Sequence, residues 1–468
     1  MLECRNVDIP GCRYAGMAIS RHIGINEDFM NPYPLYQDIN RELDRGNAFF
    51  IEKGDSGIRF SGIPEPHNRR MRHLKIGIYA GTGTSHSWLW FVDMFEKMGF
   101  QDLVFLDEMT LEQVGLKHLD VLVISGGDTF AVAESLDESG AGIIRSFVED
   151  GGLYIGSCAG AYLPMNSSKT PLNRFNFVDV KITNLSKTLP ESIKGSCKFC
   201  TSYGCDYVFH PVREEVRLKL ADSSDISEFI APMYGGPGMK VSNPSMVLAY
   251  YDGFTDKTSF LVHETIASKT LIGHAAIVRM PFGQGSFYLF GPHLEHPNYP
   301  AANKWIADAI FWETGSRNGM PVADVKKAIW VDDFETLSGQ LAVDFVRDLK
   351  RELSNSRIVA SSLEFVPVSW LIGKKVYEPE KVRVFLESMW KRIKPLEKQD
   401  VLNLSTRSAE QMIQTARLIT TLLRKIKTGV DNHQNTCDLA ASAFDLLHKL
   451  SISFFDLYFQ SLTKTTGD

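Results

Sequence analysis

Gly151-Gly-Leu-Tyr-Ile-Gly-Ser-Cys-Ala-Gly-Ala-Tyr-Leu163 reads as a strand, a tight turn and a helix, with a cysteine at the turn. The apolar residues 153–155 predict a short strand, and the stretch after Gly160 is compatible with a helix. Small residues on both sides of Cys158 permit the sharp turn of a nucleophile elbow. The dipole and free N–H groups of the following helix favour a thiolate there. We therefore predict that Cys158 is a nucleophile; the structural alternative is a small buried cysteine in a tight turn.

A second motif supplies a base for this thiol. Residues 283–297 read Gly-Gln-Gly-Ser-Phe-Tyr-Leu-Phe-Gly-Pro-His-Leu-Glu-His-Pro, a strand that ends in His293 and Glu295. Because these two residues are two apart, their side chains point the same way in an extended segment. A carboxylate can thus orient the imidazole that serves Cys158 as base. A lone histidine after a strand is more often structural, but the combination predicts a Cys-His-Glu triad.

Two glycines at the end of an earlier strand are candidates for an oxyanion hole. The apolar run 120–125 predicts a buried parallel strand, and Gly126 and Gly127 follow it. Their backbone N–H groups, together with that of Ala159, would face a developing oxyanion. The alternative is a plain strand-to-helix turn capped by Asp128 or Thr129, and both can hold because they use different atoms.

With these motifs in this order, the chain resembles the class I glutamine amidotransferase-like superfamily and, within it, the domain at the N-terminus of eukaryotic biotin–protein ligases and its free-standing prokaryotic homologues. The Gly-Gly-Asp-Thr and Cys-Ala-Gly-Ala pieces are also similar to peptidase E and cyanophycinase, which carry Ser in place of Cys158. The resemblance covers about residues 74–300. The segments that carry it are 74–85, 124–129, 156–163, 234–237 and 291–295.

The resemblance implies a flavodoxin-like α/β domain with a mainly parallel sheet flanked by helices. It implies Cys158 as nucleophile, His293 as base and Glu295 as orienting acid. Cys-Ala-Gly-Ala replaces the Cys-Leu-Gly-His/Gln of true glutaminases, and no Gly-Arg-Gly-Arg-type biotin loop is present, so biotin ligation is not expected. The expected oxyanion and pocket residues are Gly126, Gly127, Ala159, Thr84, Ser85, Tyr234, Gly235 and Gly236.

Two further motifs have open interpretations. Gly81-Thr-Gly-Thr-Ser-His86 invites a dinucleotide reading but lacks the third glycine, so these residues either line the pocket or cap a helix. Cys197, Cys200, Cys205 and His210 have the spacing C-x2-C-x4-C-x4-H, which suits a structural zinc ion. The alternative is three incidental cysteines, two of them forming a redox pair. The chemistry predicted for Cys158 requires no cofactor.

Length and pattern divide the chain of 468 residues into three parts. Residues 1–70 form an irregular N-terminal extension with a hairpin near 49–60. Residues 71–318 alternate strands and helices, as an α/β domain does. Residues 319–468 are a helical domain, which we interpret as a bundle or αα-hairpin module. Its predicted helices are 333–353, 379–393, 408–427 and 438–462.

Composition excludes several classes of function. The net charge of −6 and dispersed basic residues argue against nucleic-acid binding. No apolar run approaches about 20 residues, and no signal-peptide pattern is present, so we expect no membrane association. Seven cysteines, one at a nucleophile position, fit a reduced cytoplasmic setting.

We therefore expect a cysteine-dependent amide hydrolase or amidotransferase-like protein that acts on a small-molecule amide or a peptide through a thioester. The alternatives are a catalytically retired binding or scaffold protein, and a peptidase related to peptidase E. The aromatic end of the helical region is a candidate interface for a protein partner or a homo-oligomer.

Overall fold

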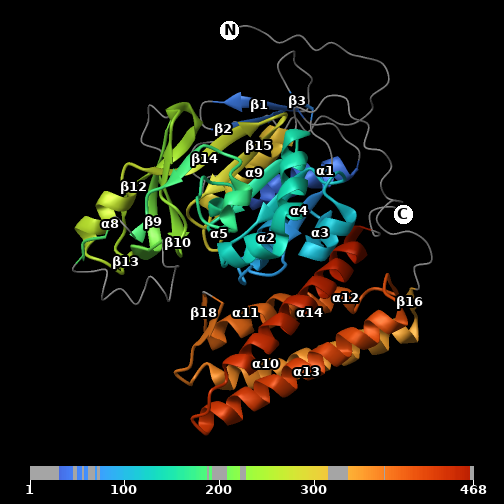
Figure 1. Ribbon diagram of the computed structural model, residues 1–468. Coiled ribbons are helices and arrows are strands. Elements are labelled where there is room, and N and C mark those ends of the chain that lie inside the picture. Colours follow the sequence, from blue (N-terminus) through green and yellow to red (C-terminus); the bar gives the residue numbers. More distant parts are fainter. Residues whose placement is uncertain are drawn as a thin grey trace, which may run out of the picture.

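A single large sheet organises the N-terminal two-thirds of the protein, and a layer of long helices lies beside it (Figure 1). The computed structural model describes residues 31–45, 50–54, 57–61, 69–70, 74–186, 189–191, 208–221, 228–314, 336–373 and 375–463. The order along the path of the large sheet is β10-β9-β12-β14-β15-β7-β6-β4-β5. The strands on this path are β4 (Ile76–Tyr79), β5 (Leu103–Leu106), β6 (Val121–Ile124), β7 (Leu153–Ser157), β9 (Val212–Leu220), β10 (Glu228–Met233), β12 (Val247–Phe254), β14 (Ala275–Phe282) and β15 (Gly285–Phe290).

One half of this sheet is parallel, as the uninterrupted apolar runs predict. Strands β5, β4, β6, β7 and β15 pair in parallel. In β6, Val121 and Val123 enter the hydrophobic core on one face, whereas Leu122 and Ile124 enter the core on the other. Both faces are covered, which is why the strand is apolar throughout. The carboxyl ends of β6, β7 and β15 meet at one edge, where the predicted site residues follow them.

The other half of the sheet is antiparallel, and the sequence patterns did not predict its strands. Strands β14, β12, β9 and β10 continue from β15 by antiparallel pairing. Short strands extend this half, and one three-stranded sheet and two strand pairs lie outside the large sheet among the described residues. These strands are β1 (Phe50–Gly54), β2 (Gly57–Ser61), β3 (Arg69–Arg70), β8 (Val180–Ile182), β11 (Met239–Val241), β13 (Ser259–Phe260), β16 (Leu337–Ser338), β17 (Trp370–Ile372), β18 (Lys375–Tyr377) and β19 (Val401–Leu402). The antiparallel pair β1–β2 confirms the hairpin predicted near residues 49–60.

Helices cover both faces of the sheet. On one face α3 and α4 contribute to the core, and on the other α1, α2 and α9 do so. Tyr36 of α1 donates a hydrogen bond to Asp308 of α9, which ties part of the N-terminal extension to the α/β domain. The helices of this part are α1 (Tyr33–Asp44), α2 (Trp88–Lys97), α3 (Glu108–Val114), α4 (Thr129–Glu149), α5 (Ala159–Tyr162), α8 (Glu264–Leu271) and α9 (Pro300–Thr314).

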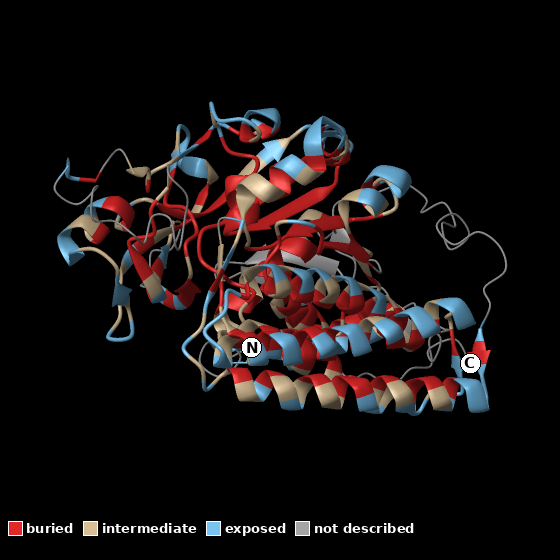
Figure 2. Cartoon of the chain, turned by 60° about the horizontal axis from the view of Figure 1, so that its bottom comes forward, coloured by how far each residue is buried: buried red, intermediate tan, exposed pale blue. Residues whose placement is uncertain are grey.

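The helical region consists of amphipathic helices, as predicted, with somewhat different bounds. Along its long helices buried residues face the protein and exposed residues face outward (Figure 2). The predicted start at residue 333 lies outside the described residues; the helix observed there is α10. These helices are α10 (Gln340–Leu363), α11 (Pro379–Trp390), α12 (Ile393–Leu396), α13 (Thr406–Asp431) and α14 (Cys437–Thr463). Among the described helices, none combines the length and apolarity needed to span a bilayer.

The helical region shares a hydrophobic core with one face of the sheet. Trp88 of α2 packs edge-on against Phe385 of α11 and Phe455 of α14, and Phe105 of β5 also contacts Phe455. All of these side chains are almost completely buried. Apolar burial of this kind is the main stabilising contribution to such an interface.

A buried arginine fixes this interface electrostatically. The guanidinium of Arg392 is 2% exposed and donates to Glu96 at 2.6 Å and to Asp93 at 2.8 Å, both on α2. It also donates to the carbonyl of Ser388 at 2.8 Å. Removing one partner of a buried charge pair leaves the other charges uncompensated.

Arg392→Ala is therefore expected to lower the free energy of unfolding by about 3 kcal/mol. The exposed pair between Lys427 and Asp431 on α13 supplies the matched control, because Lys427→Ala should cost less than about 0.5 kcal/mol. Urea unfolding monitored by circular dichroism measures both. Equal losses in the two variants would contradict a stabilising role for the Arg392 contacts.

Candidate functional site

Cys158 stands at a strained turn between β7 and α5. Its backbone has φ +52° and ψ −105°, a conformation rarely adopted by residues other than glycine. Gly156 and Gly160 allow the turn, because a Cβ on Gly156 would lie 2.2 Å from the Gly160 carbonyl oxygen, and one on Gly160 would lie 1.9 Å from that of Ile124. The turn has the geometry predicted for a nucleophile elbow.

His293 and Glu295 follow β15 and meet Cys158. The His293 imidazole is hydrogen-bonded to the Cys158 thiol, and its Nδ1 lies 2.6 Å from Glu295 Oε1. The hydroxyl of Ser157 donates to both Glu295 oxygens, at 3.1 and 2.9 Å. The thiol, imidazole and carboxylate are only 4%, 3% and 0% exposed. The three predicted residues therefore form one continuous chain of contacts.

The electrostatics of this chain favour a thiolate and an imidazolium. Burial opposes ionisation of Cys158, but the neighbouring positive charges of His293 and Lys375 lower the pKa of the thiol. Burial likewise opposes protonation of His293, but Glu295 and Cys158 raise the pKa of the imidazole to about 9. Each group thus stabilises the ionised form of the other.

The backbone N–H groups of Gly127 and Ala159 are the predicted oxyanion donors. Among the described residues neither Gly127 nor Ala159 has a hydrogen-bond partner for its N–H. Both residues line the cleft that contains Cys158. The Asp128 carboxylate meanwhile accepts from the N–H groups of Phe130 and Ala131 as the N-cap of α4. The Asp128 cap thus leaves these two N–H groups unused, and their role as oxyanion donors stays a prediction.

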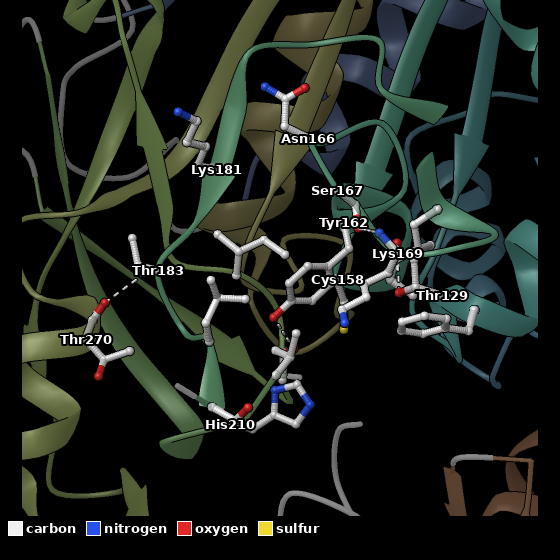
Figure 3. Close-up of a pocket in the computed structure, with 18 of the residues that line it drawn as sticks. Thr129, Cys158, Tyr162, Asn166, Ser167, Lys169, Lys181, Thr183, His210 and Thr270 are labelled. Atoms are coloured by element: carbon white, nitrogen blue, oxygen red, sulfur yellow. Dashed lines mark hydrogen bonds between the residues drawn. The ribbon is translucent and has the colours of Figure 1, made fainter. Parts of the chain in front are cut away.

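A cleft of about 1390 Å³ opens above the thiol. In the view of Figure 3, Tyr162 and Lys169 overlap Cys158, His210 is drawn below them, and Lys181 and Asn166 are drawn above; all of these residues line the cleft. Thr183 and Thr270 form a hydrogen bond of 2.9 Å in its wall. The volume is sufficient for a ligand larger than a single amino acid.

The predicted pocket residues fall into two groups. Gly127, Ala159, Tyr234 and Gly235 are among the residues that line the cleft. The remaining four, Gly126, Thr84, Ser85 and Gly236, are not among them.

These four residues pack behind the cleft and support it. The Ser85 hydroxyl donates to the Gly126 carbonyl at 3.1 Å, and the Thr84 hydroxyl donates to that of Gly81 at 2.7 Å. A Cβ on Gly126 would lie 2.7 Å from Cε1 of His293, and one on Gly236 would lie 1.6 Å from the Gly291 carbonyl oxygen. Their observed contribution is close packing around the site, and a contact with a ligand stays a prediction.

Two aromatic residues pack against His293; the sequence predicted Tyr234 as a pocket residue but gave no indication of Trp90. Trp90 of α2 meets the imidazole edge-on with ring centroids 5.3 Å apart, and Tyr234 lies on another side at 5.7 Å. Trp90 also contacts His296 at 4.5 Å. Burial and the charge on His293 lower the pKa of His296 to about 4, so His296 is neutral at pH 7. No local pattern marks Trp90, because its contact with His293 depends on the tertiary fold.

The predicted zinc ligands are mostly outside the described residues. Cys197, Cys200 and Cys205 lie there, and the zinc site stays a prediction. His210 is described: it is buried, lines the cleft, and its Nδ1 has no hydrogen-bond partner among the described residues. Burial, Lys375 and Arg213 lower the pKa of His210 to about 3. Within the described ranges, no three His, Cys, Asp or Glu side chains are grouped to hold a metal.

Comparison with solved structures gave several chains of low identity. A glutamine amidotransferase is 16% identical with a TM-score of 0.33, covering 51% of this chain and 98% of its own. A β-galactosidase from Bacillus circulans sp. alkalophilus is 13% identical with a TM-score of 0.31, covering 53% and 32%. A ThuA-like protein from Bacteroides uniformis is 14% identical with a TM-score of 0.29, covering 52% and 91%. None of the curated proteins compared with the chain matches it.

The chain also matches a family model over half of its length. The model described as "Biotin-protein ligase, N terminal" matches residues 74–310. This range begins just before β4, ends within α9 and contains Cys158, His293 and Glu295. The chain therefore belongs to the biotin-protein ligase N-terminal family.

Proposed function

We propose that this protein hydrolyses an amide through a thioester on Cys158. The observation that supports this function is the buried chain of contacts from the Cys158 thiol through His293 to Glu295, at a strained turn that exposes the thiol to a cleft. The same arrangement of nucleophile, base and orienting acid serves acyl transfer on unrelated folds.

The first half of the reaction forms the thioester. The Cys158 thiolate attacks the carbonyl carbon of the amide, and the oxygen takes the negative charge within reach of the N–H groups of Gly127 and Ala159. The His293 imidazolium gives its proton to the leaving nitrogen as the C–N bond breaks. Ammonia or an amine departs, and the acyl group stays on sulfur.

The second half releases the acid. The neutral His293 takes a proton from water, whose oxygen attacks the thioester carbonyl. The C–S bond breaks, the thiolate is restored and the carboxylic acid leaves. Glu295, held by the Ser157 hydroxyl, keeps Nδ1 of His293 protonated and the ring aligned throughout.

Turnover is expected to have a bell-shaped dependence on pH. Activity requires the thiolate of Cys158, so it rises with pH through the lowered pKa of that thiol. It also requires protonated His293, so it falls as the pH rises through about 9. Release of ammonia or amine from a panel of side-chain amides and short peptides, measured between pH 5 and 10, checks this profile.

Trapping the intermediate tests the mechanism directly. Acid quenching during turnover should leave an acyl adduct on the peptide that contains Cys158, detected by mass spectrometry, and Cys158→Ser should form no thioester. A wild-type protein that releases no amine from any substrate and forms no adduct would favour the retired binding protein instead. Cleavage restricted to peptide bonds would identify a peptidase.

A further inference from the structure

The helical region contributes one side chain to the Cys158 cleft. Among the described lining residues, Lys375 is the only one that follows α9 in the sequence. It begins β18, directly after the tight turn of the β17–β18 hairpin. A Cβ on Gly373 in this turn would lie 3.3 Å from Oδ2 of Asp128, so the hairpin reaches the N-terminus of α4, next to Gly127 and the thiol.

The hairpin that carries Lys375 is held firmly. Trp370 at its start is buried and donates from Nε1 to the Thr436 hydroxyl at 2.9 Å. Tyr377 at its end packs against Phe444 of α14, with ring centroids 4.5 Å apart. Since α14 and Arg392 are fixed on α2, the position of the hairpin relative to Cys158 is set by the interface between the helices and the sheet.

Lys375 is also close enough to the site to act on it electrostatically. It is one of the two positive charges that lower the pKa of Cys158. Burial lowers the pKa of Lys375 itself, while Cys158 and Asp128 oppose this change and Arg213 adds to it. A buried cation is stabilised electrostatically when an anion binds in the cleft beside it.

The wall of the cleft is strongly cationic. Its described lining contains five lysines and a single carboxylate, Asp128, which already caps α4. Of the five, Lys375 lies near the thiol and the other four are exposed. The five lysines are Lys169, Lys181, Lys240, Lys269 and Lys375. No ion pair with a described carboxylate is formed by the last four of them. This excess contrasts with the net charge of −6 for the whole chain, so basic residues are concentrated here.

We propose that the substrate is an amide that carries two or more carboxylates, and that Lys375 binds the carboxylate nearest the scissile bond. The exposed lysines hold the others. This inference rests on the proposed function and makes the helical region part of the substrate site. Lys375 is then a specificity residue: it selects the charge of the substrate, while Cys158 and His293 carry out the reaction.

Two alkylating reagents that differ in charge test this preference at the thiol. Iodoacetate is anionic and iodoacetamide is neutral, and both label Cys158, which peptide mass spectrometry can follow. The ratio of their rates at Cys158, divided by the same ratio at Cys437, cancels the intrinsic difference between the reagents. At pH 7 this quotient is expected to be about 10, which is the effect of one charge-assisted contact.

Substitutions then assign the effect to Lys375. Lys375→Met should lower the quotient severalfold, with the remainder due to the charge on His293 and the exposed lysines, and Lys375→Arg should retain most of the wild-type value. Lys425→Met, an exposed lysine on α13 that does not line the cleft, is the matched control and should change nothing. A wild-type quotient of one, or a quotient unaffected by Lys375→Met, would overturn the inference while leaving the proposed hydrolysis intact.

A binding measurement separates this inference from failure of the chemistry. If Cys158 reacts with neither reagent, the melting temperature is measured with triglutamate and with triglutamine at matched ionic strength. A larger rise with triglutamate that disappears in Lys375→Met supports the anion site even in a protein without turnover. Equal rises with the two peptides would overturn it.

Discussion

In a His293→Ala variant, alkylation of Cys158 by iodoacetamide at pH 7 is expected to fall by about 100-fold. His293 provides the largest of the effects that lower the pKa of this thiol, and without it burial dominates. Burial then holds the pKa of the thiol above the free-cysteine value of about 8.5, so only a few per cent or less is ionised at pH 7, and only the thiolate reacts. Peptide mass spectrometry of the alkylated protein gives the rate.

Two controls accompany this measurement. Cys437, at the start of α14, serves as an internal reference whose alkylation should not change. Glu295→Gln keeps the imidazole but removes the carboxylate charge that raises the pKa of His293, so its effect should be smaller and in the same direction. An unchanged rate in His293→Ala would mean that the imidazole does not activate the thiol.

Gly160→Ala is expected to destabilise the fold by about 3 kcal/mol or more. The added Cβ would lie 1.9 Å from the carbonyl oxygen of Ile124, a backbone atom of the central strand β6 that cannot move aside cheaply. The same backbone segment carries the hydrogen bond from Gly160 N–H to the Ser125 carbonyl at 3.1 Å. Urea unfolding measures the loss.

Gly142 provides the matched control for this substitution. It lies exposed in α4, and a Cβ there would meet nothing within 4 Å. Gly142→Ala should therefore leave stability unchanged or raise it by up to about 1 kcal/mol, because alanine has the higher helix propensity. Similar stability changes in the two variants would show that the turn at Cys158 tolerates a side chain at its third residue.

The parts of the site that could be predicted from the sequence are those set by local backbone geometry. Cys158 is marked by its small neighbours, and the spacing of His293 and Glu295 marks them as a pair at a strand end. Asp107 caps the helix that follows its strand, because its carboxylate accepts from the N–H of Thr110 at the start of α3. This capping role also depends only on local backbone geometry. The nucleotide interpretation is further disfavoured because the third glycine of the motif is absent after Gly83.

Other features depend on contacts between distant parts of the chain. Ser157 binds Glu295, and Lys375 reaches the cleft from the helical region; neither contact has a sequence signature. The element α4 consists of two helical segments that meet at a kink at Asp137, where φ is +50° and the carboxylate accepts from Ser139 N–H.

The aromatic contacts between Trp88, Phe105 and Phe455 can form only late in biosynthesis. The sheet strand and helix that carry Trp88 and Phe105 leave the ribosome long before α14, which supplies Phe455. Until α14 has been translated, the nascent α/β domain exposes an apolar face that will be completely covered in the finished protein. This surface is where a chaperone would be needed during synthesis, and where premature termination would lead to aggregation.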